Sequence, residues 1–581
     1  MINMNTLAKD KISSILKNAF SKAAAAGLLA DAAGFDIASL TGAVEVPRDA
    51  KNGDFAATHA LAAAKKLGVP PRSLAGVLAE NIELDGTYFG SVSVAGPGFI
   101  NFTLSQKWYA EALRVIENEG EAYGASDSGR GERVMIEFVS ANPTGPMTIG
   151  NARGGVLGDA LASVLSRAGY DVRREFYVND AGNQVALFGK SVDARYMQLV
   201  LGENAVEFPE KGYQGEDIKE LARLIFDENG DSLAALPEEE RVRRFIAFGI
   251  PRNTERMKLD LERYGINYDT WFLESSLHAS GYVDETVELL IKSGLTYEKD
   301  GALWLRNTDF GAEKDEVLRR SDGFYSYDAV DIAYHRNKFA ERGFDRVINV
   351  LGADHHGHTI RFGATMSAPA LREALGIKNG KLEFRLMQMV RLTRGGETVK
   401  VSKRTGKAIT LSDLLDEISV DACRFFFNAK PDNHLEFDLD LAIRQDSENP
   451  VYYVQYAHAR ICSLIRALAA EGFAVKSVAE LEAAPSGAQL SALSGEFEKE
   501  LIKQLALLPD ELALAARELD PSRVNRYVTE LATRFHKFYT ACRIKGEVPD
   551  ILSARLKLAD LTRGVIKNCL TITGVSAPEK M

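Results

Sequence analysis

Cysteine is scarce in this chain of 581 residues, and the four that occur lie far apart: Cys423, Cys462, Cys542 and Cys569. None belongs to a CxxC pair, which argues against a disulfide framework and against a cysteine-based zinc site. We therefore expect reduced, mostly buried thiols in a cytoplasmic protein.

Long apolar runs and an excess of basic charge are also missing. No run approaches the ~20 residues that cross a membrane, and charges interrupt the first apolar segment, unlike a secretory signal. The net charge is −11 and the pI about 5.5, which argues against a small DNA-binding module. A large enzyme can still contact nucleic acid through local patches.

What is present is typical of globular proteins, with 46% hydrophobic and 26% charged residues. At about 100–200 residues per domain, the length indicates three or four domains. We predict an α/β multidomain protein with an N-terminal α/β domain (1–125) and an all-α C-terminal domain (446–581). Between them we predict a doubly wound parallel-sheet, Rossmann-like domain (126–445) with a helical insertion around 201–300.

Alternating elements predict the parallel sheet. VMIEFVS (134–140) is a continuous apolar run with a single Glu, as in a buried parallel strand. A glycine-rich turn, a helix ending at Gly169 and a second strand (172–180) follow it. RVINVLGAD (346–354) adds a strand much further along, and after about residue 445 the apolar pattern is almost entirely helical.

The glycine-rich turn, ANPTGPMTIGN (141–151), has the character of a phosphate-binding connection. Gly145, Gly150, Gly154 and Gly155 would let the backbone approach a ligand, and the helix start would offer unpaired N–H groups. The turn matches neither GxGxxG nor GxxxxGK[ST], so neither the dinucleotide nor the P-loop interpretation applies. The alternative is a tight strand-to-helix connection that binds nothing.

A second stretch, VKVSKRTGKAIT (399–410), gathers Lys400, Lys403, Arg404 and Lys407 around a serine and a glycine. A basic loop of this kind can neutralise a polyphosphate leaving group. Its alternative is a solvated basic loop.

Together, PTGPMTIGN and KVSKR resemble the two signatures of class I aminoacyl-tRNA synthetases. Longer stretches resemble the arginyl-tRNA synthetase family within that class: IEFVSANPTGP (136–146), EFYVNDAGNQ (175–184), SDGFYSYDAVDIAYHRNKFAERGFD (321–345), VLGADHHGH (350–358) and KVSKRTGKAITLSDLLDE (400–417). The chain near both ends is similar to the family as well: 46–68, 453–461 and 570–581. The resemblance spans nearly the whole sequence.

The resemblance implies ATP-dependent ligation of L-arginine to its cognate tRNA through an arginyl-adenylate, with release of AMP and pyrophosphate. It further implies Mg²⁺ entering with ATP, a first step that needs tRNA, and a monomer. The matching catalytic positions are Thr148, Gly150, Asn151, Lys400 and Lys403. The matching ATP-binding positions are Pro143, Gly145, Gly352, Asp354, His355, Val401 and Ser402.

The resemblance places the substrate guanidinium at Tyr327 and Asp331, with Glu137 as a second acid and Asn142 at the amino or carboxylate end. A guanidinium presents five donors in a rigid fork, so carboxylates and a phenol hydroxyl suit it. A spacing of four puts Tyr327 and Asp331 on one helical face. A core tyrosine at 327 and an internal arginine partner for Glu137 are the alternatives.

GADHHGH brings together three histidines, at positions 355, 356 and 358. Zinc is a competing explanation, but the segment follows a strand end in a parallel sheet, where ligands usually bind. We therefore expect no protein-bound metal, and Mg²⁺ held mainly through the ATP phosphates.

Thr148 departs from the family pattern, which has a histidine there. A threonine hydroxyl can donate a hydrogen bond but cannot be cationic. We predict that it acts as a weaker phosphate-side donor. The alternative is a tRNA-binding relative inactivated at this position. A nucleotidylyltransferase of the same fold is a third hypothesis, which leaves the helical C-terminal domain unexplained.

In that domain, Tyr453, Gln455, Tyr456, His458 and Arg460 recur on closely spaced turns. Aromatic and arginine side chains can stack on unpaired anticodon bases, so we predict that Tyr453, Gln455, Tyr456 and Arg460 bind tRNA. An interdomain packing face is the alternative. The resemblance places the N-terminal domain at the tRNA elbow, where its basic residues equally suit a solvated surface: Arg48, Lys51, Lys65 and Lys66.

Overall fold

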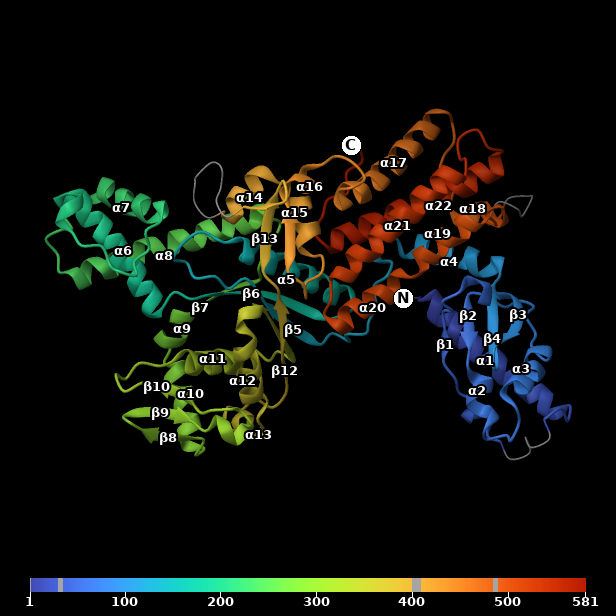
Figure 1. Cartoon of the computed structure of the whole chain (residues 1–581), viewed down its shortest axis with the longest axis horizontal. Coiled ribbons are helices and arrows are strands. Elements are labelled where there is room, and N and C mark those ends of the chain that lie inside the picture. The colour runs from blue at the N-terminus through green and yellow to red at the C-terminus, as the bar shows by residue number, and fades with distance from the viewer. Residues whose placement is uncertain (1, 30–34, 400–408, 484–489) are drawn as a thin grey trace.

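The computed structural model describes residues 2–29, 35–399, 409–483 and 490–581. The molecule is elongated, with the N-terminal unit at one end, a parallel sheet near the centre and a helical insertion at the other end (Figure 1). No helix in these described ranges is long and apolar enough to cross a membrane.

The N-terminal unit is an antiparallel sheet in the order β1-β2-β4-β3, accompanied by helices. A turn at Gly96-Pro97-Gly98 separates β3 from β4. The elements are α1 (Met4–Ala25), β1 (Val44–Glu45), β2 (Phe55–Ala57), α2 (His59–Ala64), α3 (Pro71–Glu80), β3 (Phe89–Ala95), β4 (Phe99–Leu104) and α4 (Gln106–Glu119).

The central sheet is wholly parallel, and its order β12-β11-β5-β6-β7 is the doubly wound arrangement. Its strands are β5 (Arg133–Glu137), β6 (Asp171–Val178), β7 (Thr270–Leu273), β11 (Arg346–Gly352) and β12 (Lys381–Met387). This confirms the predicted fold class. The chain reverses its winding direction between the adjacent strands β5 and β11.

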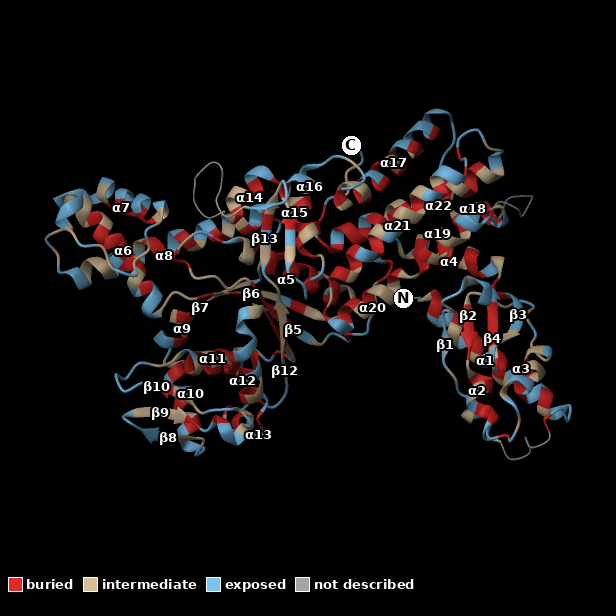
Figure 2. Ribbon diagram, in the orientation of Figure 1, coloured by how far each residue is buried: buried red, intermediate tan, exposed pale blue. Residues whose placement is uncertain are grey.

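Alternating side chains of β5 enter two different cores. Ile136 belongs to the core that contains α5 (Ile149–Arg167), whereas Met135 packs with α11 (Tyr327–Arg336) and α12 (His356–Ser367). Both faces of the strand are therefore covered, which explains its continuous apolar run. Figure 2 shows that buried residues follow α5 and β5. Buried residues also lie between the helices of the C-terminal part.

The helical insertion begins earlier than the sequence suggests. It directly follows β6 as α6 (Gly182–Leu201), α7 (Glu216–Asn229) and α8 (Glu238–Arg263), whereas β7 already belongs to the central sheet. With four residues, β7 is too short a strand for its apolar pattern to be recognised within a charged segment.

A second insertion separates β7 from β11 and carries a small antiparallel sheet, in the order β10-β9-β8. Its elements are α9 (Glu274–Ala279), α10 (Tyr282–Lys292), β8 (Thr296–Lys299), β9 (Ala302–Leu305) and β10 (Glu316–Arg319). Beyond α12, the unit is completed by α13 (Pro369–Ala374), β13 (Val390–Arg394), β14 (Glu397–Thr398), α14 (Leu411–Glu417), α15 (Val420–Phe427), β15 (Leu435–Asp438) and α16 (Leu439–Ile443).

The C-terminal part is helical in its described residues, as predicted. It contains α17 (Pro450–Ala470), α18 (Val478–Glu482), α19 (Glu496–Ala506), α20 (Leu508–Glu518), α21 (Ser522–Ala541) and α22 (Pro549–Ile572). The apolar period over 496–518 belongs to two helices, because Pro509 in the first turn of α20 starts a new one.

Two buried arginines join these parts. Arg424 on α15 donates to the carbonyls of Tyr264 and Thr573 and pairs with Asp159 on α5 at 2.5 Å. Arg153 on α5 donates to five backbone carbonyls, the nearest at 2.7 Å on Gln388. The helix that begins at the glycine-rich turn is therefore fixed on several sides.

Candidate active site

The point where the sheet reverses its winding direction collects most of the predicted site residues. Glu137 ends β5, and Gly352 ends the neighbouring strand β11. In open parallel sheets, ligands bind in the crevice outside the carboxyl ends of the strands at such a switch point. The segments that follow these two strands contain the glycine-rich turn and GADHHGH.

A hollow of about 690 Å³ lies at this point, and we call it the switch-point hollow. Its lining includes Asn142, Gly145, Thr148, Asn151 and His355, so it joins the glycine-rich turn to the histidine segment. Asp354 is largely exposed beside His355. The buried Pro143 contributes its carbonyl oxygen to Asn253 Nδ2, at 2.9 Å. Lys400, Val401, Ser402 and Lys403 lie outside the described residues.

Only two of the four glycines leave room for a ligand. A Cβ at Gly145 or Gly150 would meet nothing closer than 3.6 Å. At Gly154 it would lie 3.1 Å from Met387 Cε, and at Gly155 2.8 Å from Ile266 Cδ1. The expectation that all four admit a ligand is therefore wrong, because the latter two permit close packing of α5.

Thr148 caps α5 together with Asn151. The Thr148 hydroxyl donates to Asn151 Oδ1 at 2.8 Å and accepts from the Asn151 backbone N–H at 3.4 Å. Asn151 Oδ1 also accepts from the Thr148 backbone N–H, at 2.9 Å. The side chain is thus part of a capping box, a role that the sequence pattern did not reveal.

Strain and buried charge meet just after β5. Val139 has φ +71° and Ser140 φ +44°, values that a β-branched residue rarely adopts. The Ser140 hydroxyl compensates by donating to Glu137 Oε1, at 3.0 Å. Glu137 Oε2 lies 2.5 Å from the Nζ of Lys338, whose side chain is 0% exposed. Glu137 therefore has an internal partner, but it is a lysine rather than an arginine.

Lys338 reaches Glu137 from a π-helical turn, Asn337–Glu341, directly after α11. Its ammonium also lies 3.9 Å from the centre of the Tyr334 ring. Such turns often occur at functional sites. Sequence reasoning missed Lys338 and Ser140, since nothing in the local pattern distinguishes them.

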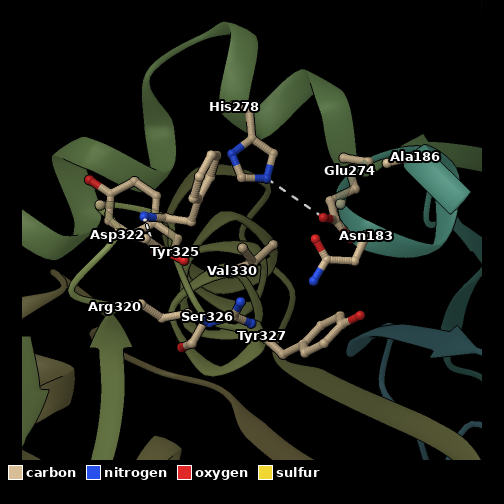
Figure 3. A pocket seen from close by; sticks show the side chains of 14 residues that line it. Asn183, Ala186, Glu274, His278, Arg320, Asp322, Tyr325, Ser326, Tyr327 and Val330 are labelled. Atoms are coloured by element: carbon tan, nitrogen blue, oxygen red, sulfur yellow. Dashed lines mark hydrogen bonds and ion pairs between the residues drawn. The ribbon is translucent and has the colours of Figure 1, made fainter. Parts of the chain in front are cut away.

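A second cavity, of about 640 Å³, opens at the start of α11, and we call it the α11 cavity. Figure 3 shows Asn183 beside Glu274 and His278 at this cavity, with Tyr327 below them. Tyr327 is 59% exposed, so it is not a core tyrosine. The buried Glu274 accepts from the hydroxyl of Tyr177 at 2.6 Å and lies 3.6 Å from His278 Nε2.

Asp331 lies one turn after Tyr327, and its side chain is about a third exposed. Burial, followed by the charge of Glu137, raises the pKa of Asp331 to about 8, while Lys338 acts in the opposite sense. His358 Nε2 lies 3.6 Å from Asp331 Oδ2, and burial lowers the pKa of His358. A cationic ligand would favour the ionised form of Asp331.

Asn142 connects the two cavities. It lines the switch-point hollow, and its Nδ2 donates to Gln184 Oε1 in the first turn of α6. The neighbouring Asn183 lines the α11 cavity. The Asn142–Gln184 hydrogen bond therefore lies beside residues that line each of the two cavities. Gln184 belongs to the EFYVNDAGNQ stretch, but its role was not foreseen.

The aromatic cluster on α17 is partly at the surface. Tyr456 is 39% exposed, with its ring stacked on Tyr452 and His536. Arg460 lies over Tyr456 and Tyr539, and the half-buried Tyr453 packs against His536.

Two residues of this pattern face the interior instead. Gln455 is buried and donates to Asp421 and to the carbonyl of Ser576. The buried His458 bonds the carbonyl of Pro578 through Nδ1. The structure therefore places Gln455, which was predicted to contact tRNA, in the interior, and both residues hold the C-terminal segment. Helical spacing alone does not specify which face is covered.

All four cysteines are free and buried. Among the described residues, no group of three or more His, Cys, Asp or Glu side chains is placed to hold a metal ion. Two histidines of GADHHGH have different surroundings. His358 stacks on Phe362, whereas His355 lines the switch-point hollow.

Family models match three successive parts of the chain. They are the arginyl tRNA synthetase N terminal domain at residues 9–104, the class I (R) tRNA synthetase catalytic domain at 114–445, and the DALR anticodon binding domain at 454–581.

Similar proteins match over the full length. An arginine–tRNA ligase of Acetivibrio thermocellus is 50% identical, and one of Caldanaerobacter subterraneus is 48% identical, each covering 100% of both chains. The arginyl-tRNA synthetase structure of Thermus thermophilus superposes with a TM-score of 0.69 at 21% identity, covering 99% of this chain and 100% of that one, and supports the fold.

Proposed function

The chain belongs to the arginyl-tRNA synthetase family, and we propose that it ligates arginine to tRNA at the switch point of the central sheet. It uses ATP to form arginyl-adenylate and pyrophosphate, then transfers the arginyl group to the terminal ribose and releases AMP. The observation that supports this location is the meeting of the glycine-rich turn and the histidine segment GADHHGH in the hollow at the carboxyl ends of β5 and β11.

We assign the nucleotide to the switch-point hollow. Gly145 leaves open space there, and Asn151 and His355 line it. The start of α5 favours negative charge. We propose that Gly352 and Asp354 lie beside the adenosine, and that Lys400, Val401, Ser402 and Lys403 complete the phosphate side. Mg²⁺ would enter with ATP, held mainly by phosphate oxygens.

We assign the guanidinium to Tyr327, Asp331 and Glu137. Tyr327 presents an exposed hydroxyl at the α11 cavity, and Asp331 follows one helical turn later. Glu137 sets the charge around Asp331, although its own carboxylate is already paired with Lys338. Asn142 would hold the amino or carboxylate end of the substrate, between the two cavities.

The raised pKa of Asp331 predicts a pH-dependent KM for arginine. Below about pH 8 the carboxyl is mostly protonated, and binding of a cation must release that proton. The KM for arginine should fall about tenfold per pH unit as the pH rises toward 8, and level off above it. Steady-state charging between pH 6 and 8.5 measures this, with the KM for ATP as the control; a KM for arginine that rises with pH would contradict the assignment.

We propose that the exposed face of α17 around Tyr456 and Arg460 contacts the anticodon loop, with Tyr453 supporting the rings. Aromatic rings and arginine planes stack on unpaired bases. For Gln455 we propose a supporting role only, since its amide is used inside the protein.

Tyr456→Ala is expected to weaken tRNA binding by about 1–3 kcal/mol, because one stacking platform is lost. Nitrocellulose filter binding with purified tRNA measures the change. Phe473→Ala is the matched control, since Phe473 is similarly exposed, at 38%, just beyond the other end of α17. Equal losses for both variants would place the anticodon elsewhere.

The same proposal includes the domain boundaries 1–125, 126–445 and 446–581, a cytoplasmic location and a monomer. Free, buried cysteines suit a reducing compartment. We further propose that basic residues of the N-terminal domain contact the tRNA elbow: Arg48, Lys51, Lys65 and Lys66.

Charging of total tRNA by the purified protein, with ATP and labelled arginine, tests the function. Accumulation of arginyl-tRNA is the expected result. Binding of tRNA without charging would favour the inactivated relative, and pyrophosphate release without any salt-dependent tRNA binding would favour the nucleotidylyltransferase.

A further inference from the structure

We propose that Thr148 is a positioning residue, which turns the Asn151 amide so that Asn151 Nδ2 faces the switch-point hollow and donates to the ATP phosphates. This inference rests on the proposed function and divides the roles of two residues within its site. It replaces the prediction that the Thr148 hydroxyl itself donates to phosphate.

The hydrogen bonds determine which end of the amide faces outward. Asn151 Oδ1 accepts from Thr148 twice, from the hydroxyl at 2.8 Å and from the backbone N–H at 2.9 Å. Oxygen and nitrogen of an amide lie on opposite sides of the same carbon, so this fixes Nδ2 on the side away from Thr148. Asn151 Nδ2 has no hydrogen-bond partner among the residues that the structure describes, and Asn151 lines the hollow.

The Thr148 hydroxyl already makes two hydrogen bonds to Asn151. Its single proton goes to Asn151 Oδ1, and one of its lone pairs accepts from the Asn151 N–H. A hydroxyl has only one proton to donate. Donation to a phosphate would therefore break the bond that orients Asn151, whereas the amide can donate without disturbing the cap.

The backbone around Thr148 is held independently of its hydroxyl. Leu411 N–H donates to the Met147 carbonyl at 2.9 Å, and Thr148 forms an antiparallel bridge with Thr410. Thr410 is itself fixed by a second capping box with Asp413. Removing the Thr148 hydroxyl should therefore leave Asn151 Oδ1 with only the backbone N–H of residue 148 as donor. The Asn151 amide is then less firmly oriented, while the turn keeps its path.

A double-mutant cycle separates positioning from direct donation. Thr148→Val keeps the β-branched shape and removes the hydroxyl, and Asn151→Ala removes the amide that would be oriented. Pyrophosphate exchange, with arginine and tRNA present, measures adenylate formation. The Kd for ATP, measured by calorimetry, gives a readout that needs no turnover.

We expect Asn151→Ala to lower the exchange rate roughly 10- to 100-fold, as for loss of a hydrogen bond to a charged group. Thr148→Val should lower it about tenfold, Thr148→Ser should restore most of that loss, and the double variant should match Asn151→Ala. Thr148→His should bring no gain over the native protein, because it also lacks the orienting hydroxyl.

Losses that multiply in the double variant, or a native-like Thr148→Val, would overturn the proposal. A faster Thr148→His variant would also overturn it and would restore the direct-donor role. The tRNA Kd of each variant controls for folding. If the native protein gives no exchange at all, the proposed function fails, and the pattern of ATP Kd values across the same five variants still decides whether Thr148 positions Asn151.

Discussion

Lys338→Met is expected to destabilise the catalytic domain by about 3–5 kcal/mol, because it leaves the buried Glu137 carboxylate without its partner. The Glu137 carboxylate then remains buried without a positively charged partner, which is unfavourable. The midpoint of the corresponding transition in scanning calorimetry should fall by about 5–15 °C.

The double variant Glu137→Gln/Lys338→Met is the control, since it removes both charges and keeps side chains of similar size. It should recover most of the lost stability, because neutral replacement of a buried pair is often tolerated. It should still bind arginine poorly, since one of the two proposed acids is gone. If Lys338→Met unfolds like the native protein, the ion pair contributes little, and Glu137 is held mainly by Ser140.

Asp331→Asn is expected to weaken arginine binding by about 2–5 kcal/mol, a factor of roughly 30 to 5,000. The substitution keeps the size of the side chain and removes the charge that the guanidinium would pair with. The KM for arginine should rise accordingly, whereas the KM for ATP should change little, because the nucleotide is assigned to the switch-point hollow. The pH dependence of the KM for arginine should disappear with the carboxyl group.

Asp328→Asn on the same helix provides the matched control. Asp328 is partly buried near Glu316 and Arg361, and burial raises its pKa as it does for Asp331. It adds only a secondary charge effect at Asp331, so we expect a change of about twofold or less in the KM for arginine. Comparable losses in the two variants would mean that α11 as a whole, rather than the Asp331 carboxylate, determines the affinity.

Structural features that depend only on residues close together in the chain could be predicted from the sequence. The apolar run at 134–140 indicated a strand covered on both faces, and the turn that follows it lines a hollow where a ligand site was predicted. The resemblance of long motifs identified the family, which the full-length matches confirm. Tyr327 and Asp331 do lie on one helix, because their spacing of four is a local property.

Partners that lie far apart in the chain could not be predicted. Lys338 meets Glu137 across 201 positions, through a π-helical turn that no local pattern signals. Gln455 reaches Ser576 across 121 positions, which moves it from the predicted surface to the interior. The same holds for Gly154 and Gly155, whose neighbours Met387 and Ile266 come from distant segments.

The sequence alone therefore determined which elements form and which family chemistry they carry, because propensity, capping and motif spacing act over a few residues. Only the tertiary structure decided which acid has a lysine partner, which glycines have open space beside them and which atom of the Asn151 amide bonds to Thr148. Those choices depend on the direction of side chains and on the desolvation of charges, and both arise only when distant segments pack together.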